Sequence, residues 1–494
     1  MNYAIIAAGE GSRLKAEGIN TPKPLVQVNG EPLMARLLRI FCANEAKVIA
    51  VICNEDSPEV EQFLRQQQQS LLEDHGVDLQ IVVRSTPSSA HSLSLLADIL
   101  GSDPFILTTV DTVFHEEWFS MYVKAFHCSL ILGVDALMGV TDYCDDEKPL
   151  YVTCDVAERI TGFHDEKPCG NYLISAGIYG LTAPALSVLH ECLKRGQSRM
   201  RNFQRALIDH HLHVEAYRLN QVFDIDHASD IEKANQLFTA QQPALPRVAV
   251  LKREPIFSPG ARDRDAALAE KIVGCLSRSY ISASLYDSID ILLNESSVRC
   301  IVSMQRSNTA LTQLSRLSEA GVPVLNTPCG VSMCGRRAKI YAALKAFGLP
   351  VPSEDGTDGV WLKNGDTWSI GSEDVVYCKT AAEVEQTRRQ FLNRGIHTIV
   401  QQAHIEGQLL KCYGVADNFF HISSSLGVDL SSLSAKLLDF ARSIGVPIFG
   451  ADLILTPEGK AYIIDFNDFP SFATCQIEAS QAIACQVIKN IQTS

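Results

Sequence analysis

The sequence between positions 7 and 23 reads AAGEGSRLKAEGINTPK and continues a short apolar run at residues 3–8. The apolar run is too short for a helix and predicts a buried strand. A strand that leads into Gly9 and Gly11 can turn closely around an anion, because neither glycine has a Cβ and the backbone N–H groups can point inward. The stretch therefore predicts a loop that binds phosphate groups.

Two cations and one more backbone position complete the predicted loop. Arg13 brings a fork of hydrogen-bond donors and Lys23 brings a mobile point charge, and both suit a nucleoside triphosphate. Ala8 precedes the glycines and is included with them as a nucleotide-binding position. The stretch matches neither of two common phosphate-binding motifs. Leu14 stands where a dinucleotide-binding fingerprint has its third glycine, and the Gly-Lys-Ser/Thr that ends a P-loop is absent. The alternative is an ordinary glycine-rich turn with a solvated lysine.

The length of 494 residues predicts about three domains. The composition, with 46% hydrophobic and 20% charged residues, is that of a globular protein. The sequence has neither an apolar run long enough to span a membrane nor an apolar leader, so we expect no membrane partner and a cytoplasmic location. Fifteen cysteines without a CxxC pair indicate reduced thiols. A net charge of −14 argues against nucleic acid as the main partner. Homo-oligomer formation is left open.

Helical spacings and apolar runs alternate from the loop to about residue 240. The predicted strands are residues 47–53, 79–83 and 105–110, and the predicted helices are residues 32–44, 59–72, 91–100 and 229–237. This alternation predicts an α/β fold with a doubly wound, mostly parallel sheet and helices on both faces. Ligands of such sheets bind at the carboxyl ends of the strands.

Three carboxylates are candidates for a metal site at that edge. Asp111 directly follows a predicted strand, on the same edge as the glycine loop. Asp224 and Asp226 lie on another predicted strand, and only one of them is expected to face the loop. Magnesium takes few protein carboxylates and completes its shell with nucleotide phosphates. We therefore predict Asp111 and Asp226 as Mg²⁺ ligands and keep Asp224 in reserve; the alternative is a set of caps or surface charges.

Several segments of residues 1–240 together resemble the sugar-phosphate nucleotidyltransferases, or NDP-sugar pyrophosphorylases, which have a GT-A-like fold. These segments are GEGSR at 9–13, PKP at 22–24, TVD at 109–111, AGIY at 176–179 and DID at 224–226. The resemblance implies catalytic, phosphate-binding roles for Arg13 and Lys23 and metal binding by Asp111 and Asp226. It also implies an NTP substrate, expected to be CTP or UTP, and a phosphorylated sugar or polyol. The segment PSSA at 87–90 departs from the family's glycine-rich base-contacting loop, so the base stays open.

A second part of the chain begins after a break in the pattern. Residues 241–246, QQPALP, contain two prolines and no periodicity, so they predict a linker. Short strands and helices alternate again over residues 247–330, which predicts a small α/β unit. Residues 331–494 form the last predicted domain.

Three side chains with oxygen ligand atoms lie on a predicted hairpin in this last domain. The hairpin at residues 449–467 carries Asp452 on one strand and Asp465 and Asn467 on the other, where a spacing of two puts both on one face. Lys363 ends an earlier predicted strand. Three oxygen ligands and a nearby lysine suit a magnesium–ATP site.

Residues 246–494 resemble the ATP-grasp fold, with the unit at 247–330 as a pre-ATP-grasp subdomain. The resemblance rests on the segment GLPVP at 348–352 and on the Asp-x-Asn pattern of the hairpin. It implies that Arg337 and Lys363 bind phosphates and that Gln402 and Glu406 bind adenine and ribose. Arg337 stands where the family commonly has lysine, and the hairpin's second carboxylate is aspartate where glutamate is usual.

The two resemblances together imply a bifunctional enzyme. The first half would transfer a nucleotidyl group to a sugar or polyol phosphate and release pyrophosphate, with Mg²⁺. The second half would use ATP to join a carboxylate to an amine through an acyl phosphate. The alternative is that one half is a catalytically inactive, nucleotide-sensing module that regulates the other.

Overall fold

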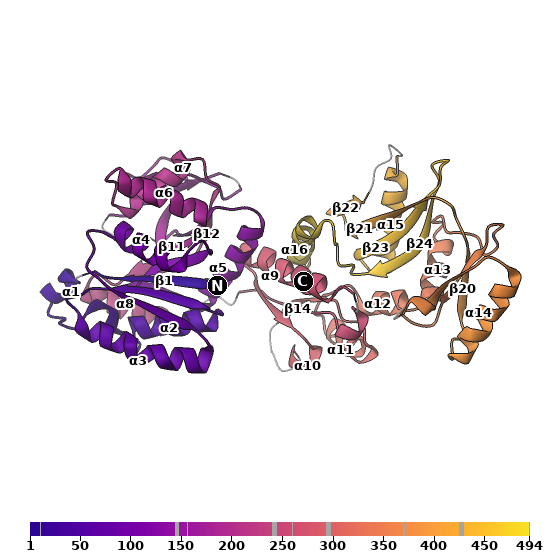
Figure 1. Ribbon diagram of the computed structural model, residues 1–494, viewed down its shortest axis with the longest axis horizontal. Helices are drawn as coiled ribbons and strands as arrows, with labels where there is room; N and C mark the ends of the chain where they lie inside the picture. The colour runs from indigo at the N-terminus through magenta and orange to yellow at the C-terminus, as the bar shows by residue number, and fades with distance from the viewer. Residues whose placement is uncertain are drawn as a thin grey trace. The chain divides into compact units, whose positions relative to one another are not determined.

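The protein was analysed as a computed structural model that describes residues 1–9, 11–143, 148–155, 157–239, 245–258, 260–292, 298–368, 371–423 and 429–493. The chain forms two compact units, Met1–Ala244 and Leu245–Ser494 (Figure 1). Positions 241–244 of the predicted linker lie outside the described residues. None of the helices described is both long and apolar enough to cross a bilayer.

The centre of the first unit is a parallel set of four strands in the order β5-β4-β1-β6. These strands are β1 (Asn2–Ala7), β4 (Val48–Cys53), β5 (Asp78–Val83) and β6 (Phe105–Thr109). They are nearly continuous apolar runs because helices cover both faces of the sheet. The mixed α/β architecture predicted for this half is thereby confirmed.

Beyond β6 the sheet becomes mixed. Strand β11 (Leu173–Leu181) runs antiparallel to β6 and also pairs with β8 and β9. The other strands of this part are β8 (Ala136–Thr141), β9 (Tyr151–Cys154), β10 (Ile160–His164) and β12 (Val214–Arg218). A separate two-stranded ribbon pairs β7 (Thr112–Phe114) with β13 (Val222–Asp224). This ribbon brings a late segment of the unit next to the end of β6.

Helices α2 and α4 lie on opposite sides of β1 (Figure 1). The helices of the unit are α1 (Ser12–Ala16), α2 (Leu33–Ala43), α3 (Pro58–His75), α4 (Ser89–Leu100), α5 (Glu116–Ile131), α6 (Ala183–Lys194), α7 (Met200–Asp209) and α8 (Ala228–Thr239). Three short elements, η1 (Lys23–Leu25), β2 (Gln27–Val28) and β3 (Glu31–Pro32), link α1 to α2.

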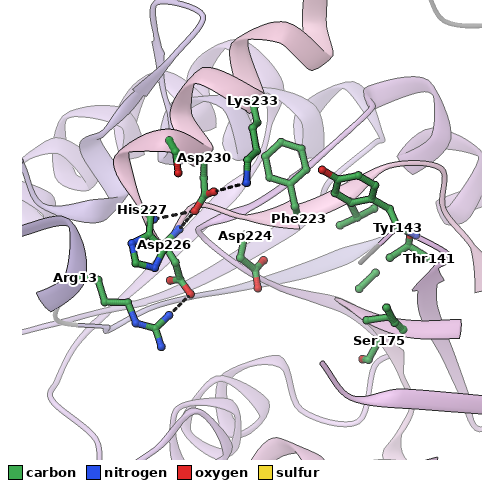
Figure 2. A pocket seen from close by; sticks show the side chains of 14 residues that line it. Arg13, Thr141, Tyr143, Ser175, Phe223, Asp224, Asp226, His227, Asp230 and Lys233 are labelled. Carbon is green, nitrogen blue, oxygen red and sulfur yellow. Dashed lines mark hydrogen bonds and ion pairs between the residues drawn. The ribbon is translucent and has the colours of Figure 1, made fainter. Parts of the chain in front are cut away.

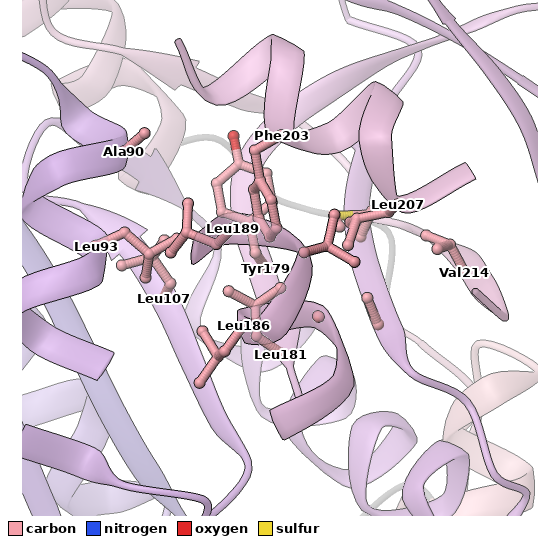
Figure 3. Packing of buried hydrophobic residues seen from close by; sticks show 14 of the residues in the cluster. Ala90, Leu93, Leu107, Tyr179, Leu181, Leu186, Leu189, Phe203, Leu207 and Val214 are labelled. Carbon is pink, nitrogen blue, oxygen red and sulfur yellow. The ribbon is translucent and has the colours of Figure 1, made fainter. Parts of the chain in front are cut away.

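Side-chain alternation along β1 divides the core between the two faces. Tyr3 stacks on Phe41 of α2, with ring centroids 4.2 Å apart. Ala4 belongs to the cluster on the other face, where α4, α6 and α7 pack against the sheet. Figure 3 shows the centre of that cluster, with Tyr179 and Phe203 among leucine side chains. Both faces of the strand that carries the glycine loop are therefore fixed by packing.

The second unit contains a small parallel sheet in the order β15-β14-β16-β17. Its strands are β14 (Arg247–Leu251), β15 (Ser282–Tyr286), β16 (Val298–Ser303) and β17 (Val324–Leu325). The helical segments in this part are η2 (Pro255–Phe257), α9 (Arg262–Arg278), α10 (Ile289–Leu292) and α11 (Asn308–Glu319).

Two antiparallel sheets follow, in the orders β19-β18-β20 and β22-β21-β23-β24. Their strands are β18 (Val360–Asn364), β19 (Val375–Cys378), β20 (Ile399–Ala403), β21 (Gln408–Val415), β22 (Phe419–Ile422), β23 (Ile448–Leu455) and β24 (Ala461–Asp468). The helical segments are α12 (Pro328–Cys334), α13 (Arg337–Ala346), η3 (Ser372–Asp374), α14 (Ala381–Asn393), α15 (Ser431–Ser443) and α16 (Gln476–Thr493). Strands β23 and β24 form the hairpin predicted at residues 449–467.

Candidate active site

The glycine loop leaves β1 and caps helix α1. Gly11 has a φ of 60° and is the N-cap of α1. A Cβ at Gly11 would lie 3.4 Å from the Cβ of Lys23, which is close to ordinary contact, so it is the left-handed backbone conformation that favours glycine here. Gly9 has open space around its Cα, and Ala8 is half-buried at the end of the strand. The loop thus holds its backbone close to Lys23.

Lys23 lies between two carboxylates. Its Nζ forms an ion pair with Asp111 and lies 2.8 Å from Oδ1 of Asp226. The lysine side chain is only 11% exposed. Burial alone would lower the pKa of Lys23, but the two carboxylates outweigh it and the pKa is raised. Lys23 is therefore a firmly charged ammonium group at the carboxyl end of β6.

Asp226 also pairs with the second cation of the loop. Arg13 Nη1 lies 2.8 Å from Oδ2 of Asp226, and both side chains are about half exposed. The structure thus brings together four residues that the sequence had singled out from three separate segments: Arg13, Lys23, Asp111 and Asp226.

Of Asp224 and Asp226, only Asp226 lines the cavity at the glycine loop, whereas both carboxylates line a neighbouring cavity. Strand β13 ends at Asp224. The Thr112 hydroxyl donates a hydrogen bond of 2.9 Å to Oδ1 of Asp224. The pKa of Asp224 is raised to about 7, mainly because the surrounding protein atoms remove water from the carboxylate and secondly because Asp111 repels its negative charge. The side chain nevertheless remains open to the cavity.

Two cavities meet at Arg13 and Asp226. The first, of about 220 Å³, is lined by the glycine loop, Lys23 and Asp111. The second, of about 200 Å³, is lined by residues of β11, β13 and α8 and is shown in Figure 2. Because the two cavities share a wall, groups bound in them would meet beside the Arg13–Asp226 pair.

The start of α8 is held by two carboxylates that the sequence did not reveal as site residues. Oδ2 of Asp230 accepts the backbone N–H of His227 at 2.8 Å and that of Asp226 at 3.1 Å. Glu17, from the end of α1, accepts the N–H of Ala228 at 2.7 Å, and its other oxygen lies 2.5 Å from Nδ1 of His227. Asp230 could have been recognised as a local helix cap. Glu17 could not, because its partners lie more than two hundred residues away.

The predicted magnesium ligands fit a cation. Asp111 and Asp226 already direct their oxygens at one positive group, the ammonium of Lys23. Carboxylate oxygens are the donors that Mg²⁺ prefers. No cluster of three or more His, Cys, Asp or Glu side chains suited to a metal occurs among the described residues. A magnesium ion held by these two carboxylates would therefore need further ligands, such as phosphate oxygens and water.

A second group of charged side chains lies in the second unit, between β18 and the β23–β24 hairpin. Lys363 is 6% exposed, and its Nζ donates a 2.7 Å hydrogen bond to the carbonyl of Ile464. Burial lowers the pKa of Lys363 to about 8. Arg337 reaches the same place: its Nη1 donates to the carbonyl of Asn364 at 3.2 Å, and its Nε lies 3.7 Å from Asp465.

The hairpin places its predicted ligands together. Asp452 and Asp465 are directly paired across the two strands, and Asn467 Nδ2 donates to Oδ2 of Asp465 at 3.3 Å. Burial raises the pKa of Asp452, whereas at Asp465 the charges of Arg337 and Lys363 outweigh burial and lower the pKa. One carboxylate of the pair is therefore stabilised in its charged form by neighbouring cations.

The two residues predicted to contact adenine and ribose differ in solvent exposure. Gln402 is buried and pairs with Trp361 on β18. Trp361 and Lys363 are two residues apart on one strand, so Gln402 shares their face of the sheet. Glu406 is exposed in the segment after β20.

The sequence also missed a buried ion pair next to the hairpin. Arg306 Nη2 lies 2.9 Å from Oδ1 of Asp468, and its guanidinium stacks 4.1 Å from the ring centroid of Trp368. The three residues come from distant segments, and no local pattern connects them.

Comparison with known proteins finds similarities to the first unit. A family model described as nucleotidyl transferase matches residues 3–241. A relative from Thermococcus kodakarensis, described as a bifunctional IPC transferase and DIPP synthase, is 31% identical over 122 residues, which are 24% of this chain and 26% of that protein. The chain thus matches about a quarter of that relative's length.

Similar solved structures cover the same half. They include the inositol-1-phosphate CTP transferase from T. maritima (18% identity, TM-score 0.38, 48% of this chain and 94% of that chain). Another is a putative glucose-1-phosphate thymidylyltransferase from Bacillus anthracis (20% identity, TM-score 0.43, 49% and 97%). A third is the CTP:phosphocholine cytidylyltransferase from Streptococcus pneumoniae (20% identity, TM-score 0.36, 48% and 98%). The match to the nucleotidyl transferase model thus lies within the first unit of the chain.

Proposed function

We propose that the first unit transfers a nucleotidyl group from a nucleoside triphosphate to a phosphorylated small molecule and releases pyrophosphate. The observation that carries this proposal is the convergence of Arg13, Lys23, Asp111 and Asp226 beside the glycine loop. The resemblance favours CTP or UTP as the nucleotide and a sugar or polyol phosphate as the acceptor.

The chemistry that this arrangement supports is an in-line displacement. A phosphate oxygen of the acceptor attacks the α-phosphorus, and the bond to the bridging oxygen of pyrophosphate breaks. Arg13 and Lys23, which face carboxylates in the free protein, would turn their charge to the phosphates and stabilise the charge that develops in the transition state. Magnesium held by Asp111 and Asp226 would supply further charge neutralisation.

The two cavities divide the substrates between them. The cavity at the glycine loop suits the triphosphate, because Gly9, Gly11 and Lys23 line it. The neighbouring cavity suits the acceptor, because it opens on the other side of Arg13 and Asp226. Both reacting groups would then lie at the shared wall, and holding them there supplies much of the rate enhancement in such a reaction.

We propose for the second unit an ATP-grasp ligase activity. A carboxylate oxygen would attack the γ-phosphorus of ATP and displace ADP, and an amine would then attack the acyl carbon and displace phosphate. The approach of Lys363 and Arg337 to the paired carboxylates Asp452 and Asp465 favours this function. Asn467 completes the set of oxygen ligands for magnesium. The competing proposal is a nucleotide-sensing module without catalysis.

Two product assays on the full-length protein test these functions. Each of the four common NTPs is incubated with Mg²⁺ and a panel of sugar, polyol and amino-alcohol phosphates, and pyrophosphate is measured. Separately, ADP is measured with ATP and a panel of carboxylates and amines. Pyrophosphate that depends on the acceptor supports the first function, and its absence with every combination contradicts it. ATP binding without ADP formation would favour the sensing module in the second unit.

A further inference from the structure

Charges in the acceptor cavity are not balanced within the protein. Three carboxylates, Asp224, Asp226 and Asp230, and two cations, Arg13 and Lys233, line this cavity. Asp226 pairs with Arg13 and also with Lys23 from the cavity at the glycine loop. Asp224 accepts a hydrogen bond from the neutral hydroxyl of Thr112, and within the part of the chain that the structure describes it makes no ion pair. One carboxylate thus faces the cavity without a cationic partner.

The cavity's own lysine does not supply the missing charge. Nζ of Lys233 lies 3.1 Å from Oδ1 of Asp230, the carboxylate that caps α8. Figure 2 shows Lys233 directed at Asp230, while Asp224 points to the other side of the cavity. An ammonium group on the ligand would give Asp224 an ion-pair partner.

Aromatic rings form the wall next to Asp224. Phe223 and Tyr143 both line the cavity, with ring centroids 6.1 Å apart and planes inclined by 53°. Figure 2 places Phe223 between Asp224 and Tyr143. Aromatic faces attract cations, most strongly where water is largely excluded. A carboxylate beside two rings is a suitable environment for an ammonium group, whereas a neutral sugar needs mainly hydrogen-bonding groups.

The geometry points to an acceptor that carries an ammonium group as well as its phosphate, such as an amino-alcohol phosphate or an amino-sugar phosphate. Its phosphate would lie at the wall with Arg13 and Asp226, and its ammonium group would pair with Asp224 against Phe223 and Tyr143. This inference rests on the proposed nucleotidyl transfer and specifies its acceptor.

Matched acceptors test the inference with the full-length wild-type protein. Phosphoethanolamine is compared with propyl phosphate, and glucosamine 1-phosphate with glucose 1-phosphate, at fixed Mg²⁺ and with CTP or UTP. In at least one pair, we expect the ammonium compound to have a pyrophosphate-releasing kcat/KM about tenfold or more above that of its neutral partner. An equal or higher kcat/KM for the neutral partner in both pairs would overturn the inference while leaving nucleotidyl transfer intact.

Variants separate the role of Asp224 from a general effect on catalysis. Asp224→Asn should reduce the ratio of ammonium to neutral kcat/KM about tenfold, and Phe223→Leu should reduce it less. Asp209→Asn, which changes an exposed carboxylate outside both cavities, should leave the ratio unchanged. An Asp224→Asn protein with equal losses for both members of a pair would overturn the inference. If no acceptor yields pyrophosphate from any NTP, nucleotidyl transfer itself fails, and this inference fails with it.

Discussion

Replacement of Lys23 by alanine should lower both the stability and the activity of the first unit. Lys23 is 11% exposed and neutralises Asp111, which is 19% exposed, and Asp226, which is 41% exposed. Removing one partner of a fully buried ion pair costs about 3–5 kcal/mol, whereas an exposed pair contributes about 0–1 kcal/mol. This partly exposed group falls between the two cases, so we expect a loss of about 2 kcal/mol.

Thermal melting and pyrophosphate release measure the two effects. A loss of about 2 kcal/mol corresponds to roughly 4–8 °C in the melting temperature of a unit of this size. The rate should fall about a hundredfold or more, which is the effect of removing one preorganised charge worth about 3 kcal/mol in the transition state. Added Mg²⁺ should recover part of the lost stability in Lys23→Ala, because the ion would neutralise the same two carboxylates.

Lys15→Ala is the control, because Lys15 is an exposed lysine on α1. It should change neither the melting temperature nor the rate appreciably. Wild-type turnover in Lys23→Ala with every NTP and acceptor that works would refute the assignment of Lys23 to the reaction. An unchanged melting temperature would refute the charge argument, because Asp111 and Asp226 would then tolerate the loss of their shared cation.

Three other substitutions test separate parts of the structure. Glu17→Gln should raise the KM for the NTP severalfold with little change in kcat, because Glu17 holds α1 against the start of α8. Steady-state kinetics would measure both constants, and a fall in kcat without a change in KM would contradict this prediction. Lys363→Met should lower ADP formation about a hundredfold while pyrophosphate release stays at the wild-type level; a loss of both products would mean that the assignment to the second unit is wrong. Phe203→Ala should destabilise the first unit by about 3–5 kcal/mol in urea unfolding, because Phe203 is fully buried, whereas Leu72→Ala, at an exposed position, should change stability by less than about 0.5 kcal/mol.

The sequence predicted the site where local pattern and strand position coincide. β1 and its glycine loop could be read from a short apolar run and two glycines, and Asp111 from its place directly after a buried strand. The place of Asp224 beside Thr112 depends on the pairing of β13 with β7, two segments more than a hundred residues apart, which local sequence does not encode. The pairs Glu17–His227 and Arg306–Asp468 join segments 210 and 162 residues apart, so only the folded chain could show them.

The wall shared by the two cavities has a thermodynamic consequence. Arg13 and Asp226 line both cavities and are joined by one ion pair of 2.8 Å. If a nucleotide in one cavity draws Arg13 to its phosphates, this ion pair would break and the neighbouring cavity would change, so occupancy of one cavity would alter affinity in the other. Linkage requires the acceptor to change nucleotide affinity by the same factor. A half-exposed ion pair contributes at most about 1 kcal/mol, which limits this cooperativity between the two ligands to about fivefold.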